Sequence, residues 1–358
     1  MNKKNQKYIF VVGGVISGVG KGVAVSSIAK ILQSRGFIVT AMKVDPYVNV
    51  DAGTMNPTEH GEVFVLADGD ETDQDMGNYE RFLDVTLPSI NYMTTGRVYR
   101  SVIAKERNLE YKGKCVQVVP HIPQEVIKRI KKASQKAKAD ITVIEIGGTA
   151  GEYENILFVE AIRMLKAEDP SDVFVAMVSY LPTPSKVGEM KTKPTQHAVR
   201  ALNSAGVQPD IIIARSDVSL DKRRKEKIAT FCNVSPSNVI SAPDVDNIYD
   251  VPINFEKGKM GDMICNGLGL KKNRKKSDLT EWKKFLGKYK NPTSEIKIGL
   301  IGKYVELQDS YKSILESFIH SGAANEVKVN VESIHSEYLN ADNVKLKLSH
   351  LDGILIAP

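Results

Sequence analysis

A glycine-rich stretch with a single lysine is the part of this sequence best suited to bind phosphate groups. Residues 13–22 read Gly-Gly-Val-Ile-Ser-Gly-Val-Gly-Lys-Gly and follow an apolar run over 8–12. Backbone N–H groups of such a turn can surround phosphate oxygens where no side chain intrudes, and a helix beginning near Lys21 would add the positive end of its dipole. Lys21 would place a point charge on the outer phosphates. The stretch therefore predicts a nucleoside triphosphate site.

This loop differs from the standard phosphate-binding motif in two ways. Five residues separate Gly14 from Gly20 where the motif has four, and Gly22 replaces the hydroxyl residue after the lysine. The usual side-chain oxygen for Mg²⁺ is thus missing, so carboxylates elsewhere must hold the metal. An ordinary glycine-rich turn is the alternative, but the preceding strand and the following amphipathic helix favour a functional loop.

Two further charged residues lie where predicted strands end. Lys43 follows the strand predicted over 37–42, and Glu145 lies near the end of the strand predicted over 140–146. A carboxylate in a buried strand is costly unless it is paired. Mg²⁺ on the phosphates is one partner, and ordinary buried hydrogen bonds are the alternative. The acidic stretch 68–81, which contains Asp75, offers further hard oxygen ligands, although its spacing does not select one.

A second group of polar donors precedes a predicted helix. Residues 191–197 read Lys-Thr-Lys-Pro-Thr-Gln-His, and Pro194 suits the first helical turn. Lysines and threonines before a helix favour a second phosphate group, while a basic helix-capping loop is the alternative. His60, His121 and His197 show neither the ordering of a catalytic triad nor the spacing of a zinc site.

These residues need a scaffold that brings the ends of several strands together. Short apolar runs rich in β-branched residues alternate with amphipathic stretches along most of the chain. Strands that are apolar on both faces predict a mainly parallel sheet with helices on both sides. We therefore predict an α/β fold, a doubly wound sheet like that of P-loop NTPases, with ligands at the carboxyl ends of the strands. The predicted strands cover 8–12, 37–42, 140–146, 173–180, 210–215 and 238–241.

The strand–helix pattern breaks and then restarts toward the C-terminal end. Residues 268–295 are polar and lysine-rich, include Pro292, and predict a linker. A basic run at 271–276 within it is interpreted as solvated rather than as a nucleic-acid contact. The pattern resumes over 296–358, a length too short for a well-packed doubly wound domain. The predicted domains are therefore 1–267, the linker 268–295, and an incomplete α/β unit over 296–358.

Composition limits the class of protein. The 358 residues carry a net charge of +6, a mild excess that suits small anionic ligands as well as nucleic acid, but no basic stripe interleaved with aromatic residues indicates nucleic-acid binding. Cys115, Cys232 and Cys265 are odd in number and lack metal-ligand spacing, which predicts reduced thiols and a cytoplasmic location. Gly13, Gly14 and Lys21 break the apolar run near the start, so we expect no signal peptide. No stretch reaches the roughly 18 apolar residues that a membrane span needs, so we expect no such span.

Taken together, these motifs resemble the amidoligase domain of CTP synthases, whose fold is shared with dethiobiotin synthetases. The resemblance runs almost continuously from residue 8 to about residue 265, and the segments 42–62 and 191–197 are the most specific. Residues 296–358 resemble only the opening of the family's class I glutaminase (glutamine amidotransferase) domain. The matching segments are 13–22, 42–62, 71–82, 117–122, 145–154, 191–197, 208–217, 231–234 and 244–249.

The resemblance implies a ligase of pyrimidine nucleotide biosynthesis. In this family ATP phosphorylates O4 of UTP, ammonia displaces the phosphate, and CTP forms. The resemblance further implies Mg²⁺ as cofactor, GTP as an allosteric activator and CTP as a feedback inhibitor. It also implies a homotetramer, because the family's UTP site is built between subunits.

The resemblance also implies roles for individual residues. Lys21 and Lys43 would stabilise charge on the transferred phosphate. Asp75 and Glu145 would hold Mg²⁺, and His121 would belong to the region that responds to GTP and guards the path of ammonia. ATP would bind Gly18, Val19, Gly20, Lys21, Gly22, Val23, Asp75, Arg215, Pro243, Asp244 and Val245. UTP and CTP would bind Ser17, Glu152, Tyr153, Glu154, Lys191, Thr192, Lys193, Pro194, Thr195, Gln196 and Lys227.

Two departures from the family pattern affect these expectations. Glu152 stands where members often have aspartate, a mild change at the feedback contact. The glutaminase nucleophile and its partners are not found, so we expect the chain to use free ammonia, and glutamine only when the missing domain is supplied. The alternatives are a dethiobiotin-type amidoligase, which segment 191–197 disfavours; a partition-type ATPase, which would need lysine at Val15 or Ile16; and an inert fragment that binds nucleotides and oligomerises.

Overall fold

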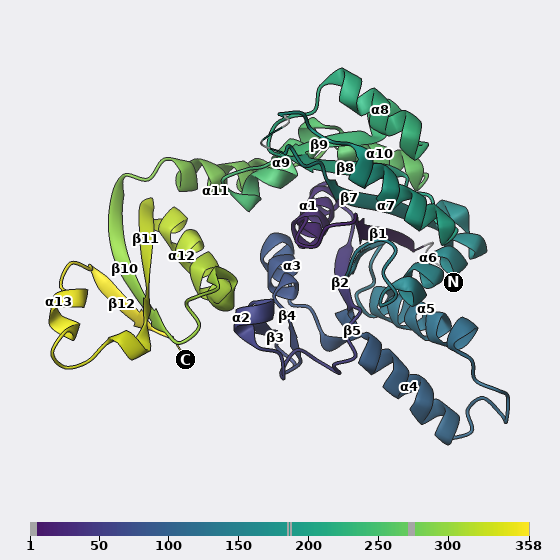
Figure 1. Cartoon of the computed structure of the whole chain (residues 1–358), viewed down its shortest axis with the longest axis horizontal. Helices are drawn as coiled ribbons and strands as arrows, with labels where there is room; N and C mark the ends of the chain where they lie inside the picture. Colours follow the sequence, from purple (N-terminus) through teal and green to yellow (C-terminus); the bar gives the residue numbers. More distant parts are fainter. Residues whose placement is uncertain (1–5, 185, 187, 271–275, 358) are drawn as a thin grey trace. The chain divides into compact units, whose positions relative to one another are not determined.

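The computed structural model describes residues 6–184, 186, 188–270 and 276–357, and the chain forms two compact units (Figure 1). Unit 1 comprises residues 1–51, 66–70 and 78–278, and unit 2 comprises 52–65, 71–77 and 279–358. The predicted domain over 1–267 did not anticipate that 52–65 and 71–77 pack with the later unit. Hydrogen bonds explain this: Glu62 N donates to Asp309 O at 2.9 Å, and Ser310 Oγ donates to Pro57 O at 2.9 Å.

Unit 1 is built on a seven-stranded sheet in the order β5-β2-β6-β1-β7-β8-β9, and every neighbouring pair is parallel. The predicted α/β class and doubly wound sheet are therefore confirmed. Strand β5 is too short to have been recognised in the sequence. The strands are β1 (Lys7–Gly13), β2 (Val39–Asp45), β5 (Tyr92–Thr94), β6 (Ile141–Ile146), β7 (Val173–Tyr180), β8 (Ile211–Ser216) and β9 (Val239–Pro243).

Helices cover both faces of this sheet, which is why its strands are apolar throughout. Phe10 and Val12 of β1 join a core with residues of the helices that follow β5 to β8. Ile9 and Val11 alternate with them, are equally buried, and face the side on which α1 packs. The helices of unit 1 are α1 (Lys21–Ser34), α4 (Thr95–Arg107), α5 (Val118–Lys136), α6 (Ile156–Glu168), α7 (Lys193–Ser204), α8 (Lys222–Cys232), α9 (Val251–Lys257) and α10 (Met260–Gly267).

The order of the strands fixes where a ligand should bind. Strand β1 lies between β6 and β7; the chain leaves β1 toward β2 and β5, returns to β6, and then crosses to β7. Loops that follow strands on either side of such a reversal diverge and leave a crevice at the carboxyl ends of the strands. The loop after β1 lies at this point, as the glycine-rich sequence predicts.

A close backbone approach in unit 1 gives a stability prediction. A Cβ added to Gly96, in the first turn of α4, would lie 1.9 Å from Val48 O. Because that neighbour is backbone, we expect Gly96→Ala to destabilise the chain by about 3 kcal/mol in urea unfolding. The matched control is Gly287→Ala in α11 (Thr280–Lys290), where the added Cβ meets no neighbour and helix propensity favours alanine by about 1 kcal/mol. Equal effects of both substitutions would contradict the backbone contact.

Unit 2 contains a smaller parallel sheet in the order β11-β10-β12. Helix α12 packs on β11, and Leu300, Tyr311 and Ala357 form its core. Strands and helices thus alternate again in the stretch where the sequence predicts that the pattern resumes. The elements are α2 (Pro57–His60), the antiparallel pair β3 (Val63–Val65) and β4 (Glu71–Asp73), β10 (Ser294–Gly302), α12 (Lys312–Asn325), β11 (Val327–His335), α13 (Val344–Leu348) and β12 (Gly353–Ile356).

The stretch predicted as a linker is more ordered than its composition suggests. Helix α11 occupies residues 280–290 within it. Its lysines dominate the composition and conceal an apolar stripe that includes the buried Leu286 and the ring pair Phe285–Tyr289. Five residues of the basic run at 271–276 lie outside the described residues. Across the ranges that are described, no helix is long and apolar enough to cross a membrane.

Candidate nucleotide-binding site

The glycine-rich loop joins β1 to α1, and helix α1 begins at Lys21 as predicted. Gly18 and Gly20 adopt φ values of 67° and 80°, which side chains with a Cβ rarely adopt. Gly14 lies so close to β7 that an added Cβ would be 2.7 Å from Ser179 Oγ. Ser17, near the tip of the loop, is exposed to solvent. The glycines therefore serve both the turn and its packing against the sheet.

A second loop, which follows β6, packs directly against the first. Lys21 Nζ donates to Gly148 O at 2.9 Å, and Ala150 N donates to Gly13 O at 3.1 Å. Gly148 has a φ of 75°, so its carbonyl can turn toward the lysine. The ammonium group of Lys21 thus lies at the edge of the sheet where the ends of β1 and β6 meet.

Lys43 and Glu145 form a buried ion pair beside these loops. Lys43 Nζ lies 2.9 Å from Glu145 Oε1, and the hydroxyl of Tyr79 donates to Glu145 Oε2. Lys43 was expected after its strand, but β2 extends to Asp45 and includes it. A charged residue can lie in this strand because Glu145 is its partner in the parallel register. The sequence offered two explanations for this buried glutamate, Mg²⁺ binding and ordinary hydrogen bonds. The observed hydrogen bonds are compatible with both, since a buried hydrogen-bonded carboxylate can also be a metal ligand.

The acidic stretch divides into residues with different surroundings. Asp70 accepts two hydrogen bonds from Arg97, at 2.7 and 2.9 Å, and is therefore a structural partner of α4. Asp75 opens helix α3 (Asp75–Leu83), and its N–H donates to Asp73 Oδ1 at 2.8 Å. Asp75 lies one helical turn before Tyr79, so the two project from the same face of α3. Within the described ranges, no group of three or more His, Cys, Asp or Glu side chains could hold a metal ion by itself.

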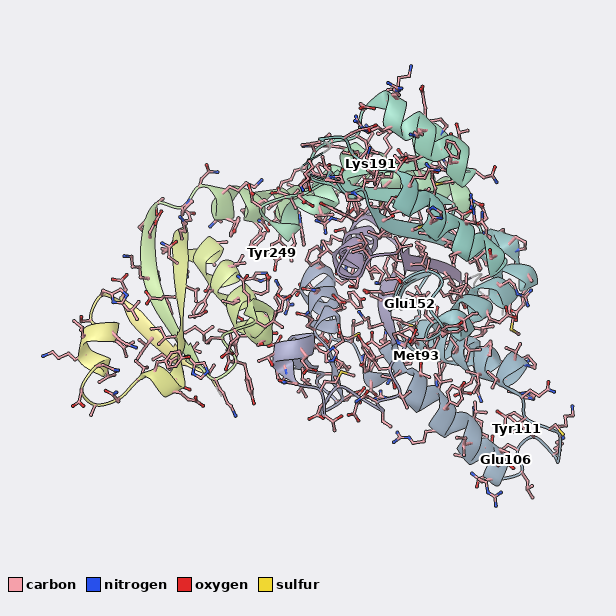
Figure 2. The ribbon with its side chains drawn as sticks, in the orientation of Figure 1. Met93, Glu106, Tyr111, Glu152, Lys191 and Tyr249 are labelled. Atoms are coloured by element: carbon pink, nitrogen blue, oxygen red, sulfur yellow. The ribbon has the colours of Figure 1, made fainter. Side chains whose placement is uncertain are left out.

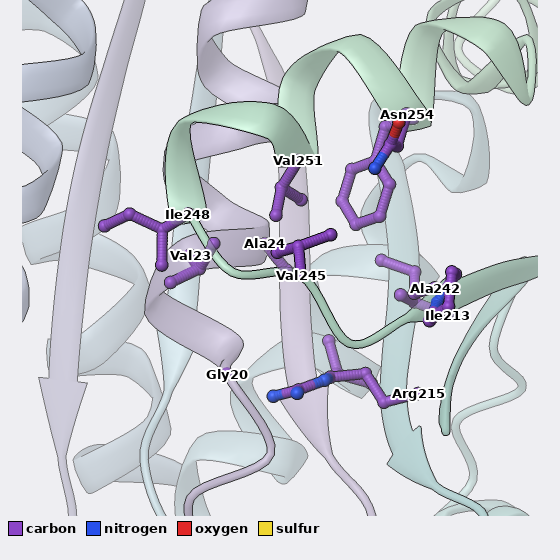
Figure 3. Close-up of a pocket in the computed structure, with 13 residues that line it drawn as sticks. Gly20, Val23, Ala24, Ile213, Arg215, Ala242, Val245, Ile248, Val251 and Asn254 are labelled. Carbon is purple, nitrogen blue, oxygen red and sulfur yellow. The ribbon is translucent and has the colours of Figure 1, made fainter. Parts of the chain in front are cut away.

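An apolar pocket lies beside the glycine-rich loop and is lined by several residues that the resemblance assigns to ATP (Figure 3). Gly20, Val23, Arg215, Pro243 and Val245 all line it, as the resemblance implies. Figure 3 shows the Arg215 side chain reaching toward Gly20, and Arg215 Nη1 donates to Val19 O at 3.3 Å. Arg215 also pairs with Asp244. The structure thus joins the predicted phosphate loop and the predicted base site in one pocket.

Part of this pocket escaped the sequence reasoning. The missed lining residues come from α1, from the strands β7, β8 and β9, and from residues 248–255 at the start of α9, where the apolar spacing is typical of ordinary core. Two of them, Ile213 and Ile248, lie inside the matching segments 208–217 and 244–249, and the others had no sequence signal. They are Ala24, Val178, Ile213, Ala242, Ile248, Val251, Asn254 and Phe255.

The second donor cluster lies at the start of α7, and Pro194 is in its first turn as predicted. Several of its polar groups are used internally: Thr195 Oγ1 lies 2.8 Å from Ser179 Oγ, and Gln196 Nε2 donates to Thr192 Oγ1 at 3.0 Å. Thr192, Thr195 and Gln196 are buried. Both threonine hydroxyl groups thus have local partners, whereas Lys193 is exposed.

Lys191 and Lys227 act on the same carboxylate. Lys191 Nζ lies 2.6 Å from Glu189 Oε2. This hydrogen bond, together with the positive charges of Lys191 and Lys227, holds the pKa of Glu189 below its usual range. Both lysines are among the residues that the resemblance assigns to UTP and CTP.

The segment after β6 and the His121 region have separate local contacts. The carboxylate of Glu152, labelled in Figure 2, accepts hydrogen bonds from Thr149 N and Thr149 Oγ1 at 2.8 and 2.6 Å. Tyr153 and Glu154 are exposed. At the start of α5, His121 Nδ1 accepts a hydrogen bond from Gln117 N at 3.0 Å, and its ring packs edge-on against Tyr111. His121 does not line the pocket beside Gly20.

A parallel α/β sheet with a glycine-rich loop, a lysine at the following helix and an adjoining apolar pocket defines a phosphate-loop nucleotide-binding protein. The sequence model of a family described as CTP synthase N-terminus matches residues 7–270. The chain therefore belongs to the CTP synthase family.

Relatives agree with this assignment. The chain is 51% identical over 353 residues to a CTP synthase of Christiangramia forsetii, a match that covers 98% of this chain and 64% of that protein. It is 47% identical over 357 residues to a CTP synthase of Methanococcus aeolicus, covering 98% of this chain and 66% of that protein. The chain thus spans slightly less than two thirds of the length of these relatives. Among solved structures, FtsY from Mycoplasma mycoides matches with a TM-score of 0.34 and 15% identity over 72% of this chain and 70% of that chain, a likeness too weak to carry an argument.

Proposed function

We propose that this chain catalyses the ATP-dependent amination of UTP to CTP with ammonia, in pyrimidine nucleotide biosynthesis. The observation that carries this proposal is the pocket lined both by Gly20 of the phosphate loop and by Arg215, Pro243 and Val245, with Lys21 next to Gly20 at the start of α1. Family membership supplies the substrate class, because a phosphate loop alone does not select an acceptor.

ATP is proposed to bind along the loop after β1. Its phosphates would accept hydrogen bonds from the backbone of residues 18–23, and Lys21 would leave Gly148 O to neutralise the outer phosphates. The adenine ring would enter the apolar pocket between Val23 and Val245, with Arg215 at its rim. This placement uses the predicted ATP residues in unit 1 without rearranging the sheet.

Mg²⁺ is proposed to bind the carboxylates of Asp75 and Glu145. The donor chemistry fits, because Mg²⁺ favours one or two carboxylates supplemented by phosphate oxygens and water. Such a site needs only two protein carboxylates, so it does not depend on a group of three or more His, Cys, Asp or Glu side chains, which is not found among the described residues. When bound, the ion would withdraw charge from the phosphates of ATP.

UTP is proposed to lie on the other side of the phosphate loop, near Ser17, the exposed Lys193, and the pair Lys191 and Lys227. The buried contact between Thr195 and Ser179, beside Gly14, ties the start of α7 to the loop after β1. That tie supports a short distance between the two nucleotides. Residues 152–154 are proposed to contact CTP when it acts as an inhibitor.

The chemistry follows from these positions. O4 of UTP attacks the terminal phosphate of ATP, the bond to the ADP oxygen breaks, and charge on the transferring group is neutralised by Lys21 and Lys43. Ammonia then attacks C4, inorganic phosphate leaves with the O4 oxygen, and the protonated amine loses a proton to give CTP. Excluding water protects the phosphorylated intermediate from hydrolysis.

Ammonia rather than glutamine is proposed as the nitrogen donor for this chain. Cys232 and Cys265 are buried, and burial raises the pKa of the Cys232 thiol to about 11, so that thiol is a poor nucleophile near neutral pH. Cys115 is exposed, in the turn between α4 and α5. A homotetramer and GTP activation through the His121 region are further proposals that rest on the family resemblance.

The test is CTP formation from UTP, ATP and Mg²⁺, measured once with ammonium chloride and once with glutamine. CTP with ammonium chloride alone is the expected result. CTP with glutamine would overturn the proposed nitrogen donor. ATP and UTP binding without CTP in either assay would favour the second candidate, an inert nucleotide-binding fragment, and failure to bind ATP would overturn the proposed function.

A further inference from the structure

The carboxylate of Glu145 has a donor on each oxygen. Lys43 Nζ donates to Oε1 at 2.9 Å, and the Tyr79 hydroxyl donates to Oε2. The side chain of Glu145 is 2% exposed, and Tyr79 is fully buried. A carboxylate held in this way cannot rotate without breaking a hydrogen bond in a buried environment, where water does not replace it.

The lysine of this network lies between two acids. Lys43 and Glu145 are register partners on the adjacent strands β2 and β6, and Asp45 Oδ1 lies 3.7 Å from Lys43 Nζ on the same strand. Asp45 is also buried. When Lys43 leaves Glu145, it therefore remains beside a negative charge at the carboxyl ends of the strands, where the phosphate loop lies.

We propose that Lys43 and a divalent cation compete for Oε1 of Glu145, while Tyr79 holds Oε2 and so acts as a positioning residue for the metal ligand. The inference rests on the proposed function, because it assumes that Glu145 receives the cation that accompanies ATP. An ammonium group and a divalent cation on the same carboxylate oxygen repel each other strongly at this depth of burial. The cation can bind Oε1 only when Lys43 moves away.

This competition links the two charges that act on the phosphates. A cation that takes Oε1 turns Lys43 toward the crevice, where its ammonium group can meet the transferring phosphate. ATP that arrives with its metal therefore obtains both charges, whereas ATP without metal obtains Lys21 but not Lys43. Tyr79 keeps the carboxylate in one orientation during the exchange, so its loss weakens the metal site without removing a ligand.

The first experiment compares Mn²⁺ binding by the full chain and by Lys43→Met, with free Mn²⁺ followed by its electron paramagnetic resonance signal. Removing the competing ammonium group is expected to tighten Mn²⁺ binding several-fold. Thermal unfolding is measured in parallel: Lys43→Met is expected to lower Tm, and millimolar Mn²⁺ is expected to recover most of the loss. If Lys43→Met does not fold, Lys43→Gln takes its place with the same expectations.

Lys7→Met is the matched control. Lys7 is also a buried lysine of the same sheet, and its Nζ lies 2.6 Å from Asp172 Oδ1. It is the first residue of β1, at the end of that strand away from the phosphate loop. Its replacement is expected to lower Tm with no recovery by Mn²⁺. Equal or weaker Mn²⁺ binding by Lys43→Met than by the unchanged chain would overturn the competition, as would equal Mn²⁺ recovery of both variants.

The second experiment tests Tyr79. Tyr79→Phe is expected to weaken Mn²⁺ binding about tenfold, as loss of an outer hydrogen-bond partner does at other metal sites. Tyr92→Phe, at another fully buried tyrosine, is expected to leave it unchanged. Equal affinities in both variants would overturn the positioning role.

ATP binding is measured separately without metal, so that a failure of the proposed ATP site is distinguished from a failure of the competition. If no Mn²⁺ binds even in the presence of ATP, both the proposed metal site and the competition are overturned.

Discussion

Replacing Lys21 by alanine is expected to lower ammonia-dependent CTP formation by about 10³-fold, because one preorganised charge on a transferring group contributes on this scale. Lys21 is the residue at which helix α1, the loop after β1 and the loop after β6 meet. The variant is also expected to bind ATP more weakly. Initial rates at saturating UTP and ammonium chloride, with ATP varied, would separate the two effects.

Lys30→Ala is the control for this prediction. Lys30 lies on the same helix, and its Nζ donates to Gln33 Oε1 at 3.0 Å, away from the glycine-rich loop. Its replacement is expected to leave the rate within about twofold, since Lys30 lies about two and a half helical turns from Lys21 and does not line the pocket beside Gly20. A comparable loss of rate in both variants would show that the charge of α1, rather than the position of Lys21, governs activity.

Glu145→Gln is expected to destabilise the chain by about 3 kcal/mol, because it leaves the ammonium group of Lys43 buried beside a neutral amide. Asp45 Oδ1, 3.7 Å from Lys43 Nζ, still compensates part of the lysine's charge in this variant. We therefore expect a loss of stability at the lower end of the range that is usual for a broken buried ion pair. The double variant Lys43→Met, Glu145→Gln is expected to regain most of that stability, since replacing both charges is often nearly neutral. Urea unfolding followed by far-ultraviolet circular dichroism measures the unchanged chain, the single variants Lys43→Met and Glu145→Gln, and the double variant.

An exposed ion pair provides the comparison for this cycle. Glu189→Gln removes the partner of Lys191 at the surface, and no measurable change in the urea midpoint is expected. Additive effects in the Lys43 and Glu145 cycle would mean that the two side chains do not interact in solution. That result would also remove the basis of the proposed competition with metal.

The sequence was sufficient for the parts of the fold that repeat a pattern. The apolar runs predicted six strands of the large sheet, and the glycines with Lys21 predicted the loop at its centre. Arg215 and Val245 were placed beside that loop by the resemblance, and they line its pocket. Short elements such as β5 were missed because three residues carry too little periodicity to be recognised.

Other features depend on contacts between distant residues, which one sequence does not contain. Nothing in the sequence around Tyr79 indicates that its hydroxyl meets Glu145. The sequence also does not indicate that Thr192 and Thr195 are buried, because their hydroxyl groups could equally have faced a ligand. Residues 52–65 were assigned to the first domain by position along the chain, whereas hydrogen bonds to 309–310 place them in unit 2.

The central place of β1 in the sheet has a consequence for how the protein is made. The strand that carries the phosphate loop leaves the ribosome well before its two neighbours, which begin at residues 141 and 173. At about 5–20 residues per second, β1 waits on the order of ten seconds or more for both partners. Until then its apolar side chains and unpaired backbone groups can bind chaperones or other nascent chains. Substitutions in β6 and β7 that slow their pairing should therefore lower the yield of folded protein in cells more than they lower its final stability.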